Sequence, residues 1–247
     1  MNKCTTGACL VAATLLTPAL QARAQMEDTA PIPVGFVHLT DVTQSARLDI
    51  RYATANNFMG RPAVGYAAPT CIVTRTAALR LLEVQRELRP LGLSIKVFDC
   101  YRPQSAVHDF VAWTRDPDDQ KNKADYYPSV AKEDLLTLGY IATQSSHSRG
   151  STVDLTLEAA DPGSAGALPT QGALLPNGEV DMGTPFDLFD VKSHTSNPDL
   201  PLEVQHNRQF LQELMARHGF HGLREEWWHF TLNDEPYPDT YFNFPVR

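Results

Sequence analysis

One stretch of the sequence begins as a polar loop and continues as a strand, Ser145-Ser146-His147-Ser148-Arg149-Gly150-Ser151-Thr152-Val153-Asp154-Leu155-Thr156-Leu157. His147 and Asp154 are seven residues apart, so in an unbroken strand their side chains would point to opposite faces. Both can approach one ion only if the chain bends between them, and Gly150 allows such a bend. From Thr152 the residues alternate as in a strand, with Thr152, Asp154 and Thr156 on one face. We therefore expect His147 in the loop that enters this strand.

A second polar pair interrupts an aromatic segment near the C-terminus, Glu226-Trp227-Trp228-His229-Phe230-Thr231-Leu232. Its aromatic and β-branched residues favour a strand over a helix, and the three-residue spacing of the polar pair then requires a turn near Trp227. An unpaired carboxylate is costly to bury, so packing alone does not explain Glu226 and His229.

Together the two segments offer two imidazoles and one carboxylate as metal ligands, with a second carboxylate as a base. Three protein ligands leave one position open on a zinc ion, as in catalytic sites, whereas structural zinc sites are closed by four. The composition of this cluster therefore indicates a hydrolase. Spacing and chemistry alone leave an alternative open, in which the histidines are surface or hydrogen-bonded residues with no metal.

The chain has 247 residues, of which 43% are hydrophobic and 20% charged, as expected for one globular domain with a substantial core. Periodicity predicts helices at 76–88, 104–114 and 203–218. Strands are predicted at 48–52, 93–101, 152–157 and 227–232. This mixture indicates an α+β fold, a single domain with a mainly antiparallel central sheet flanked by helices and the zinc site at strand ends. Residues 158–180, rich in Ala, Gly and Pro, are expected to form a long exposed loop.

The first 24 residues differ from the rest of the chain. They combine a short positive start, an apolar run from Ala8 to Leu20 that is too short to span a bilayer comfortably, and the small-x-small pattern Ala22-Arg23-Ala24. We interpret residues 1–24 as a secretory signal peptide and 25–247 as the mature domain; the alternative is an apolar N-terminal helix. The mature protein is then expected to be periplasmic or secreted, with no membrane attachment after cleavage.

Removal of that segment takes away two basic residues and no acidic one, so the net charge changes from −8 to −10. A net-acidic chain without a basic cluster argues against nucleic acid or an anionic membrane as a partner. Two of the four cysteines, Cys71 and Cys100, remain, and they flank segments that we expect to be neighbours. An exported protein can join them in a disulfide; the alternative is two buried free thiols.

Three separate motifs resemble the VanX-type D-alanyl-D-alanine dipeptidases, a family of zinc metallopeptidases. They are Asp99-Cys100-Tyr101-Arg102-Pro103, the stretch from Ser145 to Leu157, and Glu226-Trp227-Trp228-His229. The resemblance runs from about Phe36 to the C-terminus, although the segment 158–180 looks longer than in compact members. It implies a small dipeptide substrate and hydrolysis of D-Ala-D-Ala to two D-Ala, in cell-wall dipeptide turnover or glycopeptide resistance.

The resemblance also implies roles for particular residues. It places one Zn²⁺ per chain on His147, Asp154 and His229, and the general base on Glu226. It places the arginine that stabilises the transition state on Arg102, which stands at the end of a strand because a residue before proline avoids the helical region. The alternative for Arg102 is an ion pair with a surface acid.

The substrate pocket is implied by single residues outside the strongest motifs. The partner of the substrate's amino group falls on Asp187, with Ser145, Tyr52 and Tyr66 as neighbours; the alternative for Asp187 is a helix N-cap. A carboxylate that pairs with a free ammonium would reject longer chains, whose nitrogen at that point is an uncharged amide.

The mechanism implied by these parts is hydrolytic. Zinc lowers the pKa of its bound water and Glu226 accepts the proton, while Arg102 balances the charge of the tetrahedral oxyanion. Two alternatives remain open, a D-Ala-D-Ala carboxypeptidase or other peptidoglycan peptidase, and a non-catalytic zinc-binding domain of the same fold. The presence of Glu226 and Arg102 favours catalysis, because a binding module needs no base beside its metal.

Overall fold

The computed structural model describes residues 31–161, 172 and 174–247. The expected signal peptide, residues 1–24, lies outside the described residues. One compact unit runs from Ile32 to Arg247. Within the described part of the chain, the helices are all too short or too polar to cross a bilayer.

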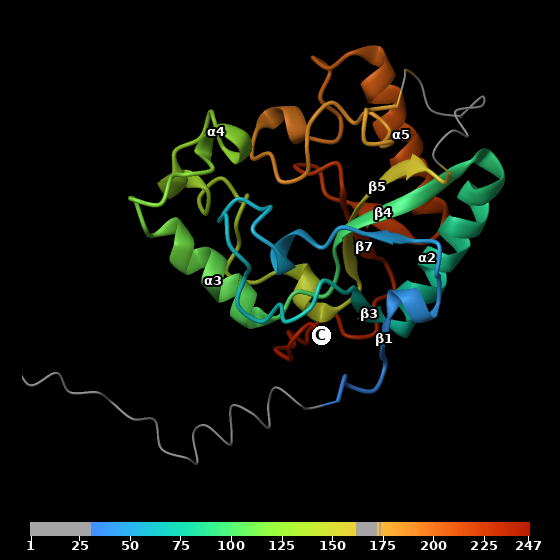
Figure 1. The fold of residues 1–247 in the computed structure, drawn as a ribbon, viewed down its shortest axis with the longest axis horizontal. Helices are drawn as coiled ribbons and strands as arrows, with labels where there is room; N and C mark the ends of the chain where they lie inside the picture. The colour runs from blue at the N-terminus through green and yellow to red at the C-terminus, as the bar shows by residue number, and fades with distance from the viewer. Residues whose placement is uncertain (1–30, 162–171, 173) are drawn as a thin grey trace, which may run out of the picture. The chain divides into compact units, whose positions relative to one another are not determined.

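A five-stranded sheet forms the centre of this body, in the order β2-β4-β5-β7-β6 (Figure 1). Its strands are β2 (Arg47–Leu48), β4 (Leu93–Asp99), β5 (Thr152–Ala159), β6 (Phe220–Gly222) and β7 (His229–Leu232). The pairing of β2 with β4 is parallel, and the other three pairings are antiparallel. A small antiparallel sheet pairs β1 (Phe36–His38) with β3 (Ile72–Thr74). The predicted α+β fold with a mainly antiparallel sheet is confirmed.

The long helices lie where the apolar periodicity predicted them. They are α2 (Arg75–Leu88), α3 (Gln104–Thr114) and α5 (Leu202–Arg217), and a short helix α4 spans Lys123–Tyr126. Each long helix agrees with its predicted bounds to within one residue. Figure 1 shows α2 running alongside β4, with α3 and α4 on the opposite side of the sheet. Short 3₁₀ helices occupy Leu39–Asp41, Arg51–Ala53, Arg89–Leu91, Lys132–Asp134, Ser146–Arg149 and Val191–Ser193.

Three predicted strands are shorter in the structure than the sequence indicated. The strand at 48–52 ends at Leu48, because the chain turns into a 3₁₀ helix that carries Tyr52 into the core, where it is 2% exposed. The strand at 93–101 ends at Asp99, and the next main-chain bond runs from Tyr101 N–H to the Ile72 carbonyl at 2.9 Å. The strand at 227–232 starts at His229, after the turn that the spacing required.

The prediction of an exposed loop over 158–180 is wrong at both ends. Glu158 belongs to β5 and bridges Glu179, and Val180 is 2% exposed and donates its N–H to the Leu157 carbonyl at 2.8 Å. The reason is that β7 pairs only with the first part of β5, Thr152 to Asp154, so the later part has free main-chain groups that the returning chain satisfies. The middle of the segment, 162–171 and 173, lies outside the described residues.

A disulfide joins the start of β3, in the small sheet, to the end of β4, in the central sheet. Cys71 directly precedes β3 and Cys100 directly follows β4, and their Cα atoms are 5.4 Å apart. Both side chains are buried. The bond therefore ties the small sheet to the end of β4, the same end at which the predicted site lies.

Candidate active site

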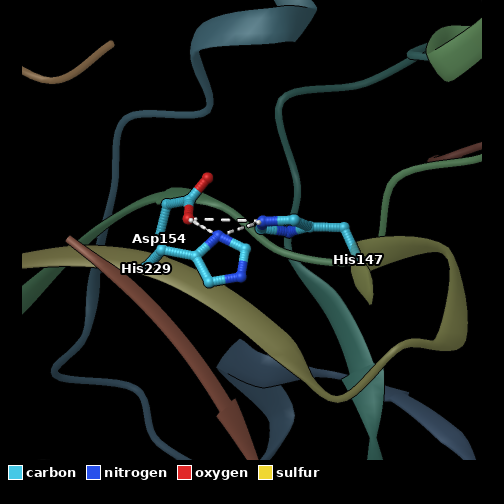
Figure 2. A group of neighbouring side chains, drawn as sticks. All are labelled: His147, Asp154 and His229. Carbon is cyan, nitrogen blue, oxygen red and sulfur yellow. Dashed lines mark hydrogen bonds and ion pairs between the residues drawn. The ribbon is translucent and has the colours of Figure 1, made fainter. Parts of the chain in front are cut away.

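His147, Asp154 and His229 converge on one point (Figure 2). Oδ1 of Asp154 lies 3.3 Å from Nε2 of His147 and 3.2 Å from Nδ1 of His229, and the two nitrogens are 3.3 Å apart. Ligand atoms at the corners of a tetrahedron, about 2.0–2.1 Å from a central zinc ion, lie about 3.3–3.4 Å from one another. The three atoms therefore have the spacing of three corners of a zinc site.

The hydrogen bonding of Asp154 fits a bound cation. Its Oδ1 atom is fully buried and has no hydrogen-bond partner among the described residues, although two ring nitrogens lie nearby. An unsatisfied buried carboxylate oxygen carries a large desolvation cost, which a metal ion at this position would offset. In the described part of the chain, these three residues form the one group of at least three metal-ligating side chains close enough to hold an ion.

His147 is placed by a short helix and the bend that follows it. It lies in the 3₁₀ helix Ser146–Arg149, where Ser145 Oγ accepts a hydrogen bond from the His147 N–H at 3.3 Å. Gly150 then adopts a φ of +84°, and a Cβ atom there would collide with the ring of Phe36. Nδ1 of His147 lies 2.7 Å from the Cys100 carbonyl, so it carries the proton and leaves Nε2 free to face Asp154.

The other site residues come from neighbouring strands. Asp154 of β5 is paired with His229 of β7 on one side and with Asp99 of β4 on the other, so the three residues form a row across the sheet. Oε2 of Glu226 lies 3.4 Å from Nδ1 of His229. Between Glu226 and His229 the turn is held by buried tryptophans, and Trp227 Nε1–H donates to Thr184 Oγ1 at 2.9 Å.

The electrostatic environment of this cluster is dominated by carboxylates. Burial lowers the pKa of His229, but the nearby carboxylates of Asp154 and Glu226 outweigh it and raise this pKa to about 9. Burial raises the pKa of Asp154, but His147 and His229 outweigh it and hold this pKa below its usual range. The carboxylates thus favour a positive charge on His229, and the histidines favour the negative form of Asp154. A cluster in which carboxylates stabilise positive charge is what we expect of a site that takes a cation.

Arg102 points into the site and not to the surface. Its Nε–H donates to Oδ2 of Asp99 at 2.9 Å, and Nη2 lies 3.6 Å from Oδ2 of Asp154. The guanidinium also lies 4.9 Å from the ring centre of Tyr52 and 5.1 Å from that of Phe110. These contacts fix a positive charge beside the candidate metal position and exclude the alternative of a surface ion pair.

Asp99 is a site residue whose role the sequence pattern did not predict. It is fully buried, and besides Arg102 it accepts a hydrogen bond from the Tyr66 hydroxyl at 2.6 Å. Burial raises the pKa of Asp99, while Arg102 and then His147 oppose the rise. The available signal was an acid three residues before the arginine, at the end of an apolar strand.

Asp187 faces the same cavity without a cationic partner. It is 4% exposed, accepts a hydrogen bond from the Tyr52 hydroxyl at 2.8 Å, and forms no ion pair with the described residues. Burial, followed by the charge of Asp154, holds the pKa of Asp187 well above its usual range. Its φ is +63° and it lies in a turn, so the alternative of a helix N-cap is wrong. A ligand that brings a positive charge would stabilise this carboxylate.

The three candidate metal ligands, Glu226, Arg102 and Asp187 line one cavity of about 200 Å³. Ser145 and Tyr52 are part of its wall, as expected, but Tyr66 is not, because its hydroxyl is directed at Asp99 behind the site. The wall combines the polar groups described above with apolar side chains, among them Phe58, Val107, Phe110, Ile141 and Phe189. The cavity thus suits a small ligand with charged ends and short apolar side chains.

Comparison with known proteins gives a consistent result. Residues 33–247 match the family model for M15 peptidases described as D-Ala-D-Ala dipeptidase. The D-alanyl-D-alanine dipeptidase of Enterococcus faecalis (strain ATCC 700802 / V583) is 42% identical over 212 residues, which cover 86% of this chain and 98% of that protein. Proteins of the same name from Streptomyces coelicolor and Enterococcus faecium are 38% and 36% identical, over 85% and 87% of this chain and 98% and 99% of theirs.

Among solved structures, the vancomycin-resistance D,D-pentapeptidase VanY in complex with Zn(II) is 15% identical to this chain. It matches with a TM-score of 0.36, over 68% of this chain and 76% of that one, a similarity too low to support an inference.

Proposed function

The chain belongs to the D-Ala-D-Ala dipeptidase family of M15 peptidases, and we propose that it hydrolyses D-Ala-D-Ala to two D-Ala with one Zn²⁺ per chain. The observation that carries the proposal is the triangle of His147, Asp154 and His229, with Glu226 beside it and Asp187 in the same cavity. Two imidazoles and one carboxylate at tetrahedral spacing fit zinc and leave one position for water.

The role proposed for the metal is limited to what the ligands support. His147 Nε2, His229 Nδ1 and Asp154 Oδ1 would hold it. When bound, zinc would polarise the scissile carbonyl and make water a better nucleophile near neutral pH.

Glu226 is positioned to move the proton. Its carboxylate lies next to His229 and lines the cavity, so it can accept a proton from the attacking water and return it to the leaving amine. Arg102 is held by Asp99 with its guanidinium in the same cavity, where it can stabilise the negative charge that develops on the carbonyl oxygen.

Asp187 gives the site its preference for a free dipeptide. Its buried carboxylate, bonded to the Tyr52 hydroxyl, would pair with the substrate's ammonium group. A peptide whose nitrogen is acylated would leave this carboxylate desolvated and unpaired. The proposed substrate is therefore a dipeptide, and longer peptidoglycan stems are excluded.

The test of this proposal compares D-Ala-D-Ala with N-acetyl-D-Ala-D-Ala. Loss of one partner from a desolvated charge pair weakens binding by on the order of 2–5 kcal/mol, so the acetylated compound should react about thirty- to several-thousand-fold more slowly. Asp187→Ala should narrow this gap by slowing the free dipeptide more. Equal cleavage of both compounds by the unaltered enzyme would point to a carboxypeptidase.

We also propose that the mature enzyme works in the periplasm or outside the cell, where it could recover D-Ala from wall fragments or confer glycopeptide resistance. The N-terminal pattern of residues 1–24 and the disulfide between Cys71 and Cys100 support an oxidising compartment. Fractionation with N-terminal sequencing should find a mature protein that begins at Gln25, and an uncleaved cytoplasmic protein would contradict this.

A further inference from the structure

The Cys71–Cys100 disulfide lies directly behind one of the candidate metal ligands. The carbonyl of Cys100 accepts the hydrogen bond from Nδ1 of His147 at 2.7 Å, and both cysteines are at most 2% exposed. A metal-bound histidine usually donates its second ring nitrogen to such an acceptor, which fixes the tautomer and the orientation of the ring. The position of Cys100 therefore bears on the position of Nε2 of His147.

The disulfide also joins the two segments that hold the loop around His147. On the Cys100 side, the Arg102 N–H donates to the carbonyl of His147 at 3.3 Å. On the Cys71 side, β3 continues to Thr74, whose N–H donates to the carbonyl of Gly150 at 2.7 Å. The loop is thus hydrogen-bonded to Arg102, two residues after Cys100, and to the last residue of β3, three residues after Cys71.

Cys100 itself lies beyond the regular pairing of the central sheet. The register between β4 and β5 is irregular between Val97 and Asp99, and β4 ends at Asp99. From there, Tyr101 N–H bonds to the Ile72 carbonyl, and the disulfide is the covalent tie between these same two segments. The segment with the Cys100 carbonyl, which orients His147, is therefore held to the β3 segment by this hydrogen bond and the disulfide, and it is not part of a regular strand pairing.

We propose that the Cys71–Cys100 disulfide is a positioning element of the metal site, so that the oxidised protein binds its metal more tightly than the reduced protein. This inference rests on the proposed zinc function. Reduction breaks the S–S bond and adds two electrons and two protons, which leaves two thiols, while a dithiol reductant closes into its own disulfide. The Cys100 carbonyl then has more freedom, and His147 loses part of its preorganisation.

The first experiment measures zinc dissociation into an excess of chelator. It compares the oxidised protein, protein reduced with dithiothreitol and desalted without air, and the double variant Cys71→Ala/Cys100→Ala. Loss of the partner that orients a metal ligand lowers metal affinity by roughly tenfold or more, so zinc should leave about tenfold faster from the last two proteins. The absorption bands of the Co²⁺-substituted protein should change in the same two samples, because they report ligand geometry.

Val84→Ala is the matched control. Val84 is fully buried in α2 and is not part of the cavity wall, so this variant should lose stability without changing the loop around His147. It should keep the zinc dissociation rate and the Co²⁺ spectrum of the unaltered protein. A similar zinc loss in Val84→Ala would show that general destabilisation, and not positioning, explains the effect. If the double variant fails to fold, the reduced protein carries the comparison.

The second experiment uses thermodynamic reciprocity. If oxidation strengthens zinc binding about tenfold, zinc binding must stabilise the disulfide by the same factor. Zinc also binds reduced dithiothreitol, so the potential of the dithiothreitol buffer is first calibrated at the same zinc concentration. Against that calibrated buffer, the reduction potential of the protein should fall by about 30 mV for the tenfold factor, measured by thiol alkylation and mass spectrometry. Equal zinc affinity in both redox states with no shift in potential would overturn the inference alone. An oxidised protein that binds no zinc would instead overturn the proposed function.

Discussion

Asp99→Asn tests whether Asp99, which is buried behind the site, fixes the orientation of the Arg102 guanidinium in the cavity. The substitution keeps the size of the side chain and removes its charge. Asp99 is fully buried and accepts hydrogen bonds from Arg102 Nε at 2.9 Å and from the Tyr66 hydroxyl at 2.6 Å. The change leaves the largely buried guanidinium without its main counter-ion.

The magnitude follows from these contacts. Breaking a buried ion pair by neutralising one partner costs about 3–5 kcal/mol of folding stability. Arg102 would still have one carboxylate nearby, that of Asp154 at 3.6 Å. We therefore expect a loss of folding stability near the lower end of this range, about 3 kcal/mol. Removal of an oxyanion-stabilising donor lowers kcat by about 10²–10³, and here the donor remains but loses its orientation, so we expect a decrease of about 10–100-fold. KM should change little, because Asp187 holds the ammonium.

The assay measures kcat and KM for D-Ala-D-Ala together with zinc content and unfolding free energy. Asp109→Asn is the control, since Asp109 also pairs with an arginine, Arg61, through two bonds of 2.7 Å each, and does not line the cavity. It should lose stability and keep kcat. Full kcat in zinc-bound Asp99→Asn, or an equal loss of kcat in both variants, would refute this role of Asp99.

Three further predictions concern pH, the bend and the base. Burial raises the pKa of Asp109, but hydrogen bonds from Arg61 and a main-chain N–H outweigh it and lower this pKa. The ion pair therefore stabilises the fold above the unfolded-state pKa, about 3.9, and this contribution is lost as pH falls through the lower folded value. The ion pair contributes only about 1 kcal/mol, because Arg61 is 42% exposed. The unfolding free energies of the unaltered protein and of Asp109→Asn should therefore converge as the pH falls below about 4, and a difference that stays constant with pH would contradict this. Gly150→Ala and Gly139→Ala both place a side chain at positive φ, which costs about 1–2 kcal/mol of folding stability. Only at Gly150 does the new Cβ meet a buried ring, so Gly150→Ala should lose about 1–3 kcal/mol more unfolding free energy than Gly139→Ala in denaturant titrations. Equal losses in the two variants would refute the close packing at Gly150. Glu226→Gln should keep its zinc and lose about 10²–10⁴-fold in kcat, and near-normal turnover would mean that another group is the base.

The local features of the fold were predictable because they depend on neighbouring residues. Apolar periodicity gave the three long helices to within one residue, and the spacing of His147 and Asp154 required the bend that Gly150 makes. The three-residue spacing of Glu226 and His229 likewise required the turn that lies between them. The candidate site was predictable because its chemistry is concentrated in short motifs.

The features that the sequence did not predict depend on distant partners. The pairing of Glu179 with Glu158 arises because β7 is too short to cover β5, which no local pattern reveals. Tyr66 was expected in the pocket, but its hydroxyl binds Asp99, and Asp99 received no role because its importance lies in the contacts with Arg102 and Tyr66. Sheet register and buried ion pairs bring together residues far apart in the chain, and only the folded structure shows which ones.

The most direct test of the central claim is the release of D-Ala by the zinc-loaded protein. The substrates are D-Ala-D-Ala, its L,L isomer and a pentapeptide that ends in D-Ala-D-Ala. We predict rapid release from the free D,D dipeptide alone, lost on removal of the metal with a chelator and restored by Zn²⁺. Release from the pentapeptide at a comparable rate, or undiminished cleavage of D-Ala-D-Ala by metal-free protein, would contradict the account.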